Sequence, residues 1–259
     1  MRLKAIIQHK KNLEEIISSK DLIAELKSGL ESGYAYKIEH SIDRNYLRNF
    51  KKSLSDDLDF QSNSYTPRVA GCPNYMQNHW DHESQVVPAK FVSWSMFPWN
   101  KESNALFEQI IPMFVLRNML AGLEPNKYLN NLDNEATARA ALQFYPSGFG
   151  YMAEHQDPYN IHQFAIPTLL LSDYGSDYYT GGFFAINDED ERVYFDQHLE
   201  FGDLTLFHTS IPHGVEVVDK EKIECNSIYD GRLMMIAAVN AYSGNNKKFE
   251  ATATSHAKD

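Results

Sequence analysis

The feature that most limits the fold is a series of short apolar runs in the second half of the chain. Gly, Pro, Asn and Asp separate the runs and favour turns, and each run has the length of one strand. The eight runs are ALQFY, GYMAEH, FAIPTLLL, GFFAIN, RVYFD, DLTLF, GVEVV and RLMMIAAV. Eight short strands predict a double-sheet jelly roll. Pro167 interrupts the third run, so the bounds of that strand stay open.

Three segments of the N-terminal half carry apolar side chains at helical spacing. They are residues 13–30, 41–58 and 106–123, and the spacing keeps these side chains mostly on one face. Pro112 is expected to kink or restart the third helix. Arg117, in the same helix, is expected at the solvated surface. The chain is therefore expected to be mainly β with flanking helices.

Residues 61–100 are rich in Pro, Asn, His and aromatic side chains and follow no sustained period. This composition is typical of a functional loop. Arg68, His79 and Trp80 offer hydrogen bonds and stacking to a substrate beneath such a lid. The alternative is an ordered loop whose aromatic side chains cover the core. A metal site at His79 and His82 lacks acidic or Cys partners at a familiar spacing.

Length and composition bound the domain organisation. The chain has 259 residues, of which 43% are hydrophobic, and this is enough for a sizeable core. We expect a single domain in three parts: helical additions and the lid loop over residues 1–140, the β core over residues 141–242, and a polar tail over residues 243–259.

The charge balance excludes some classes of partner. With 24 basic and 35 acidic side chains the net charge is -11, which opposes attraction to phosphate backbones and anionic membranes. We expect a small-molecule substrate and neither nucleic acid nor membrane. The N-terminal apolar run is too short for a signal peptide or a membrane span, and the sparse cysteines, Cys72 and Cys225, fit a reducing compartment. The cytoplasm is the expected location.

The main candidate for a functional site is the pair His155 and Asp157, two positions apart in AEHQDP. In an extended strand such residues project to one face, so an imidazole and a carboxylate can converge on one cation. Two His and one carboxylate form the facial triad of non-haem Fe(II) oxygenases. The alternative is a surface strand end, because an H-x-D pair by itself is common.

Four histidines are candidates for the second imidazole. His162 lies beyond a turn, and His198 lies in a charged hairpin where a solvated side chain is expected. His208 ends the FGDLTLF run and His213 follows in IPHGV. The residues alone do not decide between His208 and His213 as the second imidazole.

Together these residues resemble the 2-oxoglutarate and Fe(II)-dependent dioxygenase superfamily, whose pattern is H-x-D, a distal His, and then Arg or Lys. The resemblance covers about residues 141–242, where YPSGFGYMAEHQDP, YYTGGFFAI, FGDLTLF and HGV occur in the order of the superfamily. It implies a double-stranded β-helix, which is a jelly roll. It also implies iron bound by His155, Asp157 and His213 of the HGV turn.

The resemblance also implies a site for 2-oxoglutarate. Arg232, at the start of RLMMIAAV, would hold the distal carboxylate by a bidentate fork, and Tyr145 or Gln143 would add a hydrogen bond. The interval from His213 to Arg232 is longer than is common in the superfamily, and the segment VDKEKIECNSIYDG accounts for it. The alternative for Arg232 is a surface Arg at a strand start.

The implied activity is hydroxylation of an unactivated C–H bond with Fe(II), 2-oxoglutarate and O2. The metal centre is then the only catalytic group, and the expected substrate is a small polar metabolite such as an amino acid or a derivative. A peptide or protein side chain is the alternative substrate. A non-catalytic jelly-roll module that binds a small ligand or a partner is the alternative class of protein. Because Asp157 occupies the position of the carboxylate that related halogenases lack, hydroxylation is expected and halogenation is not. Substrate identity and oligomeric state stay open.

Overall fold

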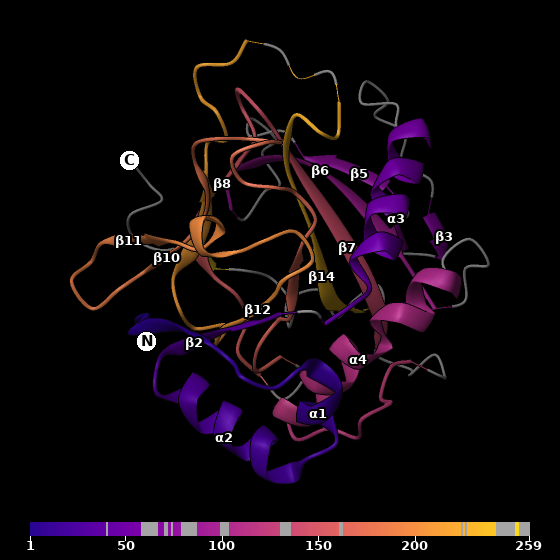
Figure 1. Cartoon of the computed structure of the whole chain (residues 1–259), viewed down its shortest axis with the longest axis vertical. Coiled ribbons are helices and arrows are strands. Elements are labelled where there is room, and N and C mark those ends of the chain that lie inside the picture. The colour runs from indigo at the N-terminus through magenta and orange to yellow at the C-terminus, as the bar shows by residue number, and fades with distance from the viewer. Residues whose placement is uncertain are drawn as a thin grey trace.

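The computed structural model describes residues 1–39, 41–57, 67–69, 72–73, 75–78, 87–98, 104–129, 136–160, 163–223, 225, 227–241 and 252–253. Its strands form a 13-stranded sheet in the order β1-β2-β12-β9-β14-β7-β6-β8-β13-β10-β11, with β5 on β6 and β15 on β8, and a separate pair of β3 and β4. Figure 1 shows this sheet curled into a mainly β body with helices along its lower and right-hand sides.

The strand bounds are β1 Ala5–Gln8, β2 Tyr34–Ile38, β3 Pro67–Val69, β4 Cys72–Pro73, β5 Tyr75–Asn78, β6 Ala89–Met96, β7 Ala136–Pro146, β8 Tyr151–Gln156, β9 Thr168–Leu170, β10 Gly182–Ile186, β11 Arg192–Tyr194, β12 Leu204–Leu206, β13 His213–Glu216, β14 Gly231–Ala241 and β15 Thr252–Ala253. The helix bounds are α1 Leu13–Ile17, α2 Lys20–Glu31, α3 Arg44–Asp57 and α4 Asn104–Leu120. Within these bounds no helix is both long and apolar enough to cross a membrane.

The sheet divides into two layers at β6. Ala89 and Lys90, at its start, pair with β8, whereas residues 92–96 pair with β7. One layer therefore contains β1, β2, β12, β9, β14, β7, β6 and β5, and the other contains β8, β13, β10, β11 and β15. This is the expected double-sheet arrangement, and it agrees with the jelly roll predicted from the eight apolar runs.

The long strands β7 and β14 separate two regions of core. They pair along their whole length, from Gly231 opposite Pro146 to Ala241 opposite Ala136. Because side chains alternate across a strand, Leu233 and Met235 of β14 face the helices and join the core there. Met234 faces the other layer together with Tyr145 of β7. This second face carries the pocket described below.

Helix α2 packs against β2 and α4 packs against β14, both in the larger layer, and α4 also contacts α1 and α2. The expected helix over residues 13–30 is divided into α1 and α2 because Ser19 starts a new helix, where its Oγ accepts a hydrogen bond from the backbone N–H of Leu22 at 3.3 Å. A capping box of Asn12 and Glu15 starts α1.

The prediction for Arg117 was wrong. Its side chain is fully buried in α4, and burial lowers its pKa to about 10. Helix α4 lies between α1 and α2 on one side and β14 on the other, so it is covered around most of its circumference. The helix also continues through Pro112 without a restart.

All eight strands predicted from the apolar runs are present, as β7 to β14. The helical interpretation of the N-terminal part missed β1 and β2, and residues 89–96, assigned to the loop, form the buried strand β6. Strands β1 and β2 are short, and β6 contains Lys and Ser, so the alternation of apolar and polar residues was weak in all three. In the tail, Thr252 and Ala253 pair with β8 beside Gln156 and His155. The three-part division of the domain stays a prediction.

Candidate active site

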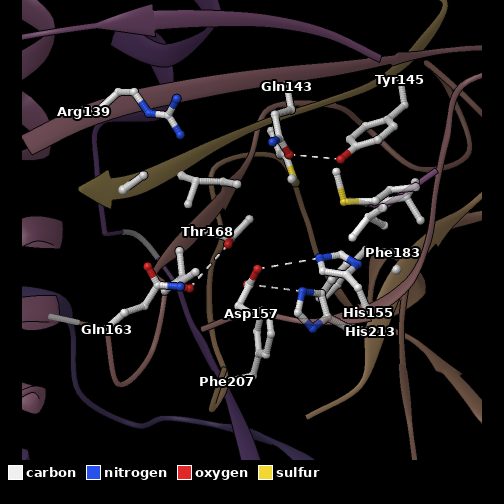
Figure 2. A pocket seen from close by; sticks show the side chains of 18 of the residues that line it. Arg139, Gln143, Tyr145, His155, Asp157, Gln163, Thr168, Phe183, Phe207 and His213 are labelled. Atoms are coloured by element: carbon white, nitrogen blue, oxygen red, sulfur yellow. Dashed lines mark hydrogen bonds and ion pairs between the residues drawn. The ribbon is translucent and has the colours of Figure 1, made fainter. Parts of the chain in front are cut away.

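Three side chains of metal-binding type converge beside β8 and β13 (Figure 2). His155 pairs directly with His213 across these antiparallel strands, and the two ring centroids are 4.3 Å apart. Asp157 follows two positions after His155, and its Oδ1 lies 3.6 Å from Nε2 of His155. Its Oδ2 lies 3.4 Å from Nε2 of His213. These separations are short enough for one cation to contact all three residues.

The backbone fixes both imidazoles in the form that a metal requires. Nδ1 of His155 lies 2.9 Å from the carbonyl oxygen of Ala153, and Nδ1 of His213 lies 2.8 Å from that of Ile211. A carbonyl oxygen only accepts, so Nδ1 carries the proton in each ring and donates it. In the neutral ring the lone pair is then on Nε2, which faces Asp157, and such a contact also fixes the ring orientation. The donor set therefore fits a divalent metal ion.

The electrostatics of the cluster favour a cation at the same place. Burial alone would raise the pKa of Asp157, but His213 and His155 outweigh it and hold this pKa well below its usual range. Burial alone would lower the pKa of His155, but the neighbouring carboxylate of Asp157 raises it. Asp157 is thus an ionised carboxylate between two imidazoles, which is the charge pattern of a metal ligand.

Two of the rival histidines, His208 and His198, lie elsewhere in the structure. His208 is buried, with its ring against Phe164 and Tyr159, and its Nδ1 accepts the backbone N–H of Ser210. It does not belong to the cluster of His155, Asp157 and His213. His198 is exposed, and His162 lies outside the described residues.

The three residues line a cavity of about 280 Å³ between the two layers. Its described walls are mainly apolar, and the residues that carry polar or charged groups are His155, Asp157, His213, Tyr145, Gln143, Thr168, Gln163 and Arg139. Phe183 and Phe207 also line the cavity and contact the ring of His213 at centroid distances of 5.8 and 4.8 Å. A concave, mostly apolar site with a few convergent polar groups is typical of small-molecule binding.

Tyr145 and Gln143 form one corner of this cavity, and their predicted hydrogen bond to 2-oxoglutarate stays a prediction. The hydroxyl of Tyr145 donates a hydrogen bond to Oε1 of Gln143 at 2.9 Å. Both residues lie on the same face of β7 because they are two positions apart. Burial raises the pKa of Tyr145, so the hydroxyl stays protonated and able to donate.

Arg232 lies behind this corner and is not among the residues that line the cavity. It is 1% exposed, and its guanidinium carbon is 6.0 Å from the ring of Tyr145 and 5.6 Å from that of Phe183. Nη1 of Arg232 lies 2.8 Å from Sδ of Met234, which does line the cavity. Arg232 therefore approaches the cavity through one nitrogen, with the thioether of Met234 in between.

Asp196 binds the other two nitrogens of Arg232. Nε donates to Oδ2 at 2.6 Å and Nη2 donates to Oδ1 at 3.0 Å, and Oδ2 also accepts the backbone N–H of Phe183 at 2.8 Å. Gly182, at φ +97°, allows this close approach, since a Cβ there would lie 2.3 Å from Oδ2. Asp196 overcomes the effect of burial and raises the pKa of Arg232, so the guanidinium remains charged.

Sequence reasoning missed Asp196 and Arg139. Asp196 gave no signal, because its partner is distant in the sequence. Arg139 could have been found, since it continues the alternation of Tyr145 and Gln143 along β7, but the strand was expected to begin only at residue 141. The side chains of Arg68, His79 and Trp80, predicted to contact the substrate, lie outside the described residues.

Comparisons with known proteins give a likeness of fold. No protein-family model matches this sequence, and no curated protein sequence matches it either. A prolyl hydroxylase from Trichoplax adhaerens, solved with a peptide fragment of the hypoxia inducible factor, superposes with a TM-score of 0.53 at 13% identity, over 92% of this chain and 96% of that chain. A putative oxygenase from Shewanella oneidensis also gives a TM-score of 0.53, at 11% identity over 92% of this chain and 90% of that one.

A third solved structure is SnoN, a non-haem α-ketoglutarate-dependent epimerase from nogalamycin biosynthesis. It gives a TM-score of 0.51 at 11% identity, over 87% of this chain and 85% of that chain. The chain thus has the jelly-roll fold that 2-oxoglutarate and Fe(II)-dependent oxygenases adopt, and at these identities the likeness concerns the fold alone.

Proposed function

We propose that this protein is an Fe(II)- and 2-oxoglutarate-dependent oxygenase that hydroxylates an unactivated C–H bond of a small polar metabolite, such as an amino acid or a derivative. The observation that carries the proposal is the convergence of His155, Asp157 and His213 in the wall of the cavity, with both Nε2 atoms facing the carboxylate. Three protein ligands of this type leave coordination positions for cosubstrate and dioxygen.

The overall reaction balances without any further reactant. 2-Oxoglutarate loses carbon dioxide and becomes succinate, one atom of O2 enters the new carboxylate of succinate, and the other enters the C–H bond as a hydroxyl group. Iron, when bound, supplies the redox chemistry. The side chains of this protein hold the metal, orient the two organic molecules and exclude water.

The distal carboxylate of 2-oxoglutarate is assigned to the corner of Tyr145, Gln143 and Arg232. Side chains of β14 alternate, so Arg232 projects to the same face as Met234, which lines the cavity. Nη1 of Arg232 points to the sulfur of Met234 and is the nitrogen that Asp196 does not bind. An entering carboxylate would displace that thioether, and the hydroxyl of Tyr145 would donate to it.

Asp157 makes hydroxylation the expected outcome. A carboxylate at this position supplies a negative charge and an oxygen donor, so chloride would have to displace an anionic protein ligand. Turnover under labelled dioxygen with excess chloride tests this point. We expect one labelled oxygen atom in the product, and a chlorinated product would contradict the role of Asp157.

The remaining assignments are a small-molecule substrate and a cytoplasmic location. The net charge of -11 disfavours nucleic acid and anionic membranes as partners. A reducing compartment keeps Fe(II) available and agrees with the presence of only two cysteines.

A screen for substrate-stimulated succinate release, with mass detection of the oxidised product, tests the proposed function. Metabolite pools and peptide pools are assayed in parallel with the purified protein, Fe(II) and 2-oxoglutarate. Oxidation of a metabolite by one oxygen atom is the expected result. Oxidation only in the peptide pools would change the substrate class, and a protein that binds no 2-oxoglutarate in the presence of Fe(II) would be a non-catalytic module.

A further inference from the structure

The cavity has a second polar end, formed by Arg139, that the proposed function has not used. Arg139 lies on β7 and lines the cavity, with its side chain half-buried. Figure 2 shows its guanidinium on the side of the cavity away from Tyr145, the same side as Gln163. We propose that Arg139 binds an anionic group of the substrate, and that the substrate is a small carboxylic acid. This inference rests on the proposed function and specifies its substrate class.

The first step is the position of Arg139 relative to the cosubstrate corner. Arg139, Gln143 and Tyr145 share one face of β7. At about 3.4 Å per residue in an antiparallel strand, the Cα atoms of Arg139 and Tyr145 are about 20 Å apart. On β14, the residue opposite Tyr145 is Arg232 and the residue opposite Arg139 is Ala238. The two arginines therefore stand at opposite ends of one face of the paired strands.

The second step is the chemistry of this end. Among the described residues that line the cavity, the charged side chains outside the histidines are Arg139 and Asp157, and Asp157 faces the two imidazoles. Nη1 of Arg139 donates to Oγ of Ser95 at 3.5 Å. A guanidinium has five N–H donors in a fixed planar fork, so it can serve a serine and a carboxylate together.

The third step is the size and charge of the ligand. A cavity of about 280 Å³ fits a small molecule, and the net charge of -11 repels polyanions such as nucleic acids. One guanidinium inside the cavity instead suits a single carboxylate. Figure 2 shows the rings of His155 and His213 on the same side of the cavity as Tyr145, away from Arg139. The oxidised carbon of the substrate is therefore expected away from the carboxylate that Arg139 holds.

Calorimetry with matched pairs of acids and amides tests the proposal directly. The probes are amino acids, N-acyl amino acids and short-chain fatty acids, each paired with its primary amide. They are titrated anaerobically into protein that contains Fe(II) and 2-oxoglutarate, and again into metal-free protein. We expect wild type to bind at least one acid roughly 30-fold or more tightly than its amide, which is the low end of the effect of removing one partner of a buried charge pair.

Three variants identify the group responsible. Arg139→Gln should abolish the preference for the acid while 2-oxoglutarate affinity is unchanged, and Arg139→Lys should retain part of the preference because it keeps the charge but loses the fork. Arg192→Gln is the matched control, since Arg192 is an exposed strand residue paired with Glu216 outside the cavity. It should behave as wild type.

Several outcomes would overturn the proposal. They are wild-type protein that binds no acid more tightly than its amide, including the case in which neither binds, and a preference that survives in Arg139→Gln. Weaker 2-oxoglutarate binding in Arg139→Gln would assign this residue to the cosubstrate instead. Wild type that binds Fe(II) but no 2-oxoglutarate would contradict the proposed function, whereas the acid preference of metal-free protein is measured independently of it.

Discussion

The two ends of the cavity hold their arginines in different ways. Arg232 is 1% exposed and is clamped by both oxygens of Asp196, one of which also accepts a backbone N–H. Arg139 is half-buried, and one of its contacts, from Nη1 to Oγ of Ser95, is long, at 3.5 Å. A clamped guanidinium is ordered before its ligand arrives and loses little entropy on binding. A less deeply buried guanidinium can adapt to ligands of different shape. The difference suits a constant cosubstrate at one end and a specific substrate at the other.

The largest effect is expected when a proposed iron ligand is replaced, because the metal site serves both ends of the cavity. His155→Ala and His213→Ala should each weaken iron binding more than about 100-fold, because even residues that merely support a ligand contribute 10- to 100-fold. His208→Ala is the matched control, since this buried histidine lies outside the cluster, and its iron affinity should be unchanged. Anaerobic iron titration measures all three. Loss of iron from the His208 variant with retention in the His213 variant would contradict the assignment of His213 as an iron ligand.

The next largest effect is expected when Asp196, which holds Arg232 by two hydrogen bonds, is replaced. Asp196→Ala leaves the charge of Arg232 buried without its main partner, so the free energy of unfolding should fall by about 3 to 5 kcal/mol. Denaturant unfolding measures this change. Asp196→Leu combined with Arg232→Met should recover most of the stability, because a well-packed apolar pair replaces the ion pair. An Asp196→Ala variant as stable as wild type would show that the ion pair of Asp196 with Arg232 contributes little to stability.

Replacement of Arg232 alone tests whether this end of the cavity binds 2-oxoglutarate. Arg232→Ala should reduce 2-oxoglutarate affinity by about 2 to 5 kcal/mol, since it removes one partner of a buried charge pair, and iron affinity should change little. Direct binding titrations of 2-oxoglutarate at saturating Fe(II) give the value. Unchanged affinity would move the distal carboxylate to another basic residue, with Arg139 as the first candidate.

The smallest effect concerns the neutral donor in the same corner. Tyr145→Phe removes the hydroxyl that donates to Gln143 at 2.9 Å, so 2-oxoglutarate affinity should fall by about 0.5 to 1.5 kcal/mol. The same titration detects this change. If affinity for carboxylic acid substrates falls instead while 2-oxoglutarate binds as before, the assignment of the two ends is reversed.

The sequence predicted the part of the fold that repeats with a clear period. The apolar runs predicted β7 to β14, and the H-x-D spacing predicted the convergence of His155, in β8, and Asp157, directly after it. Strand β6 was missed because the surrounding segment has no sustained period. The buried Arg117 was misjudged because a residue type indicates average burial and says nothing of the helices that cover it.

The site was predictable where its residues are close in sequence, and less so where they are distant. The partnership of Arg232 with Asp196 depends on the packing of β14 against the 3-10 turn at residues 196–198, which no local pattern encodes. The same holds for the division of the cavity into two ends, since it arises from the register of β7 and β14. Arg139 was accessible from alternation alone, had the strand been extended toward its start.

The most direct test of the central claim is the visible absorption of the protein with Fe(II) and 2-oxoglutarate under anaerobic conditions. Chelation of iron by the cosubstrate gives a weak charge-transfer band, which requires the metal and 2-oxoglutarate to meet in one site. Wild type and Arg139→Gln should both show the band, and Asp157→Ala should not. A wild-type protein that binds iron but shows no band, or an Asp157 variant with an undiminished band, would contradict the assignment of His155, Asp157 and His213 as the iron site.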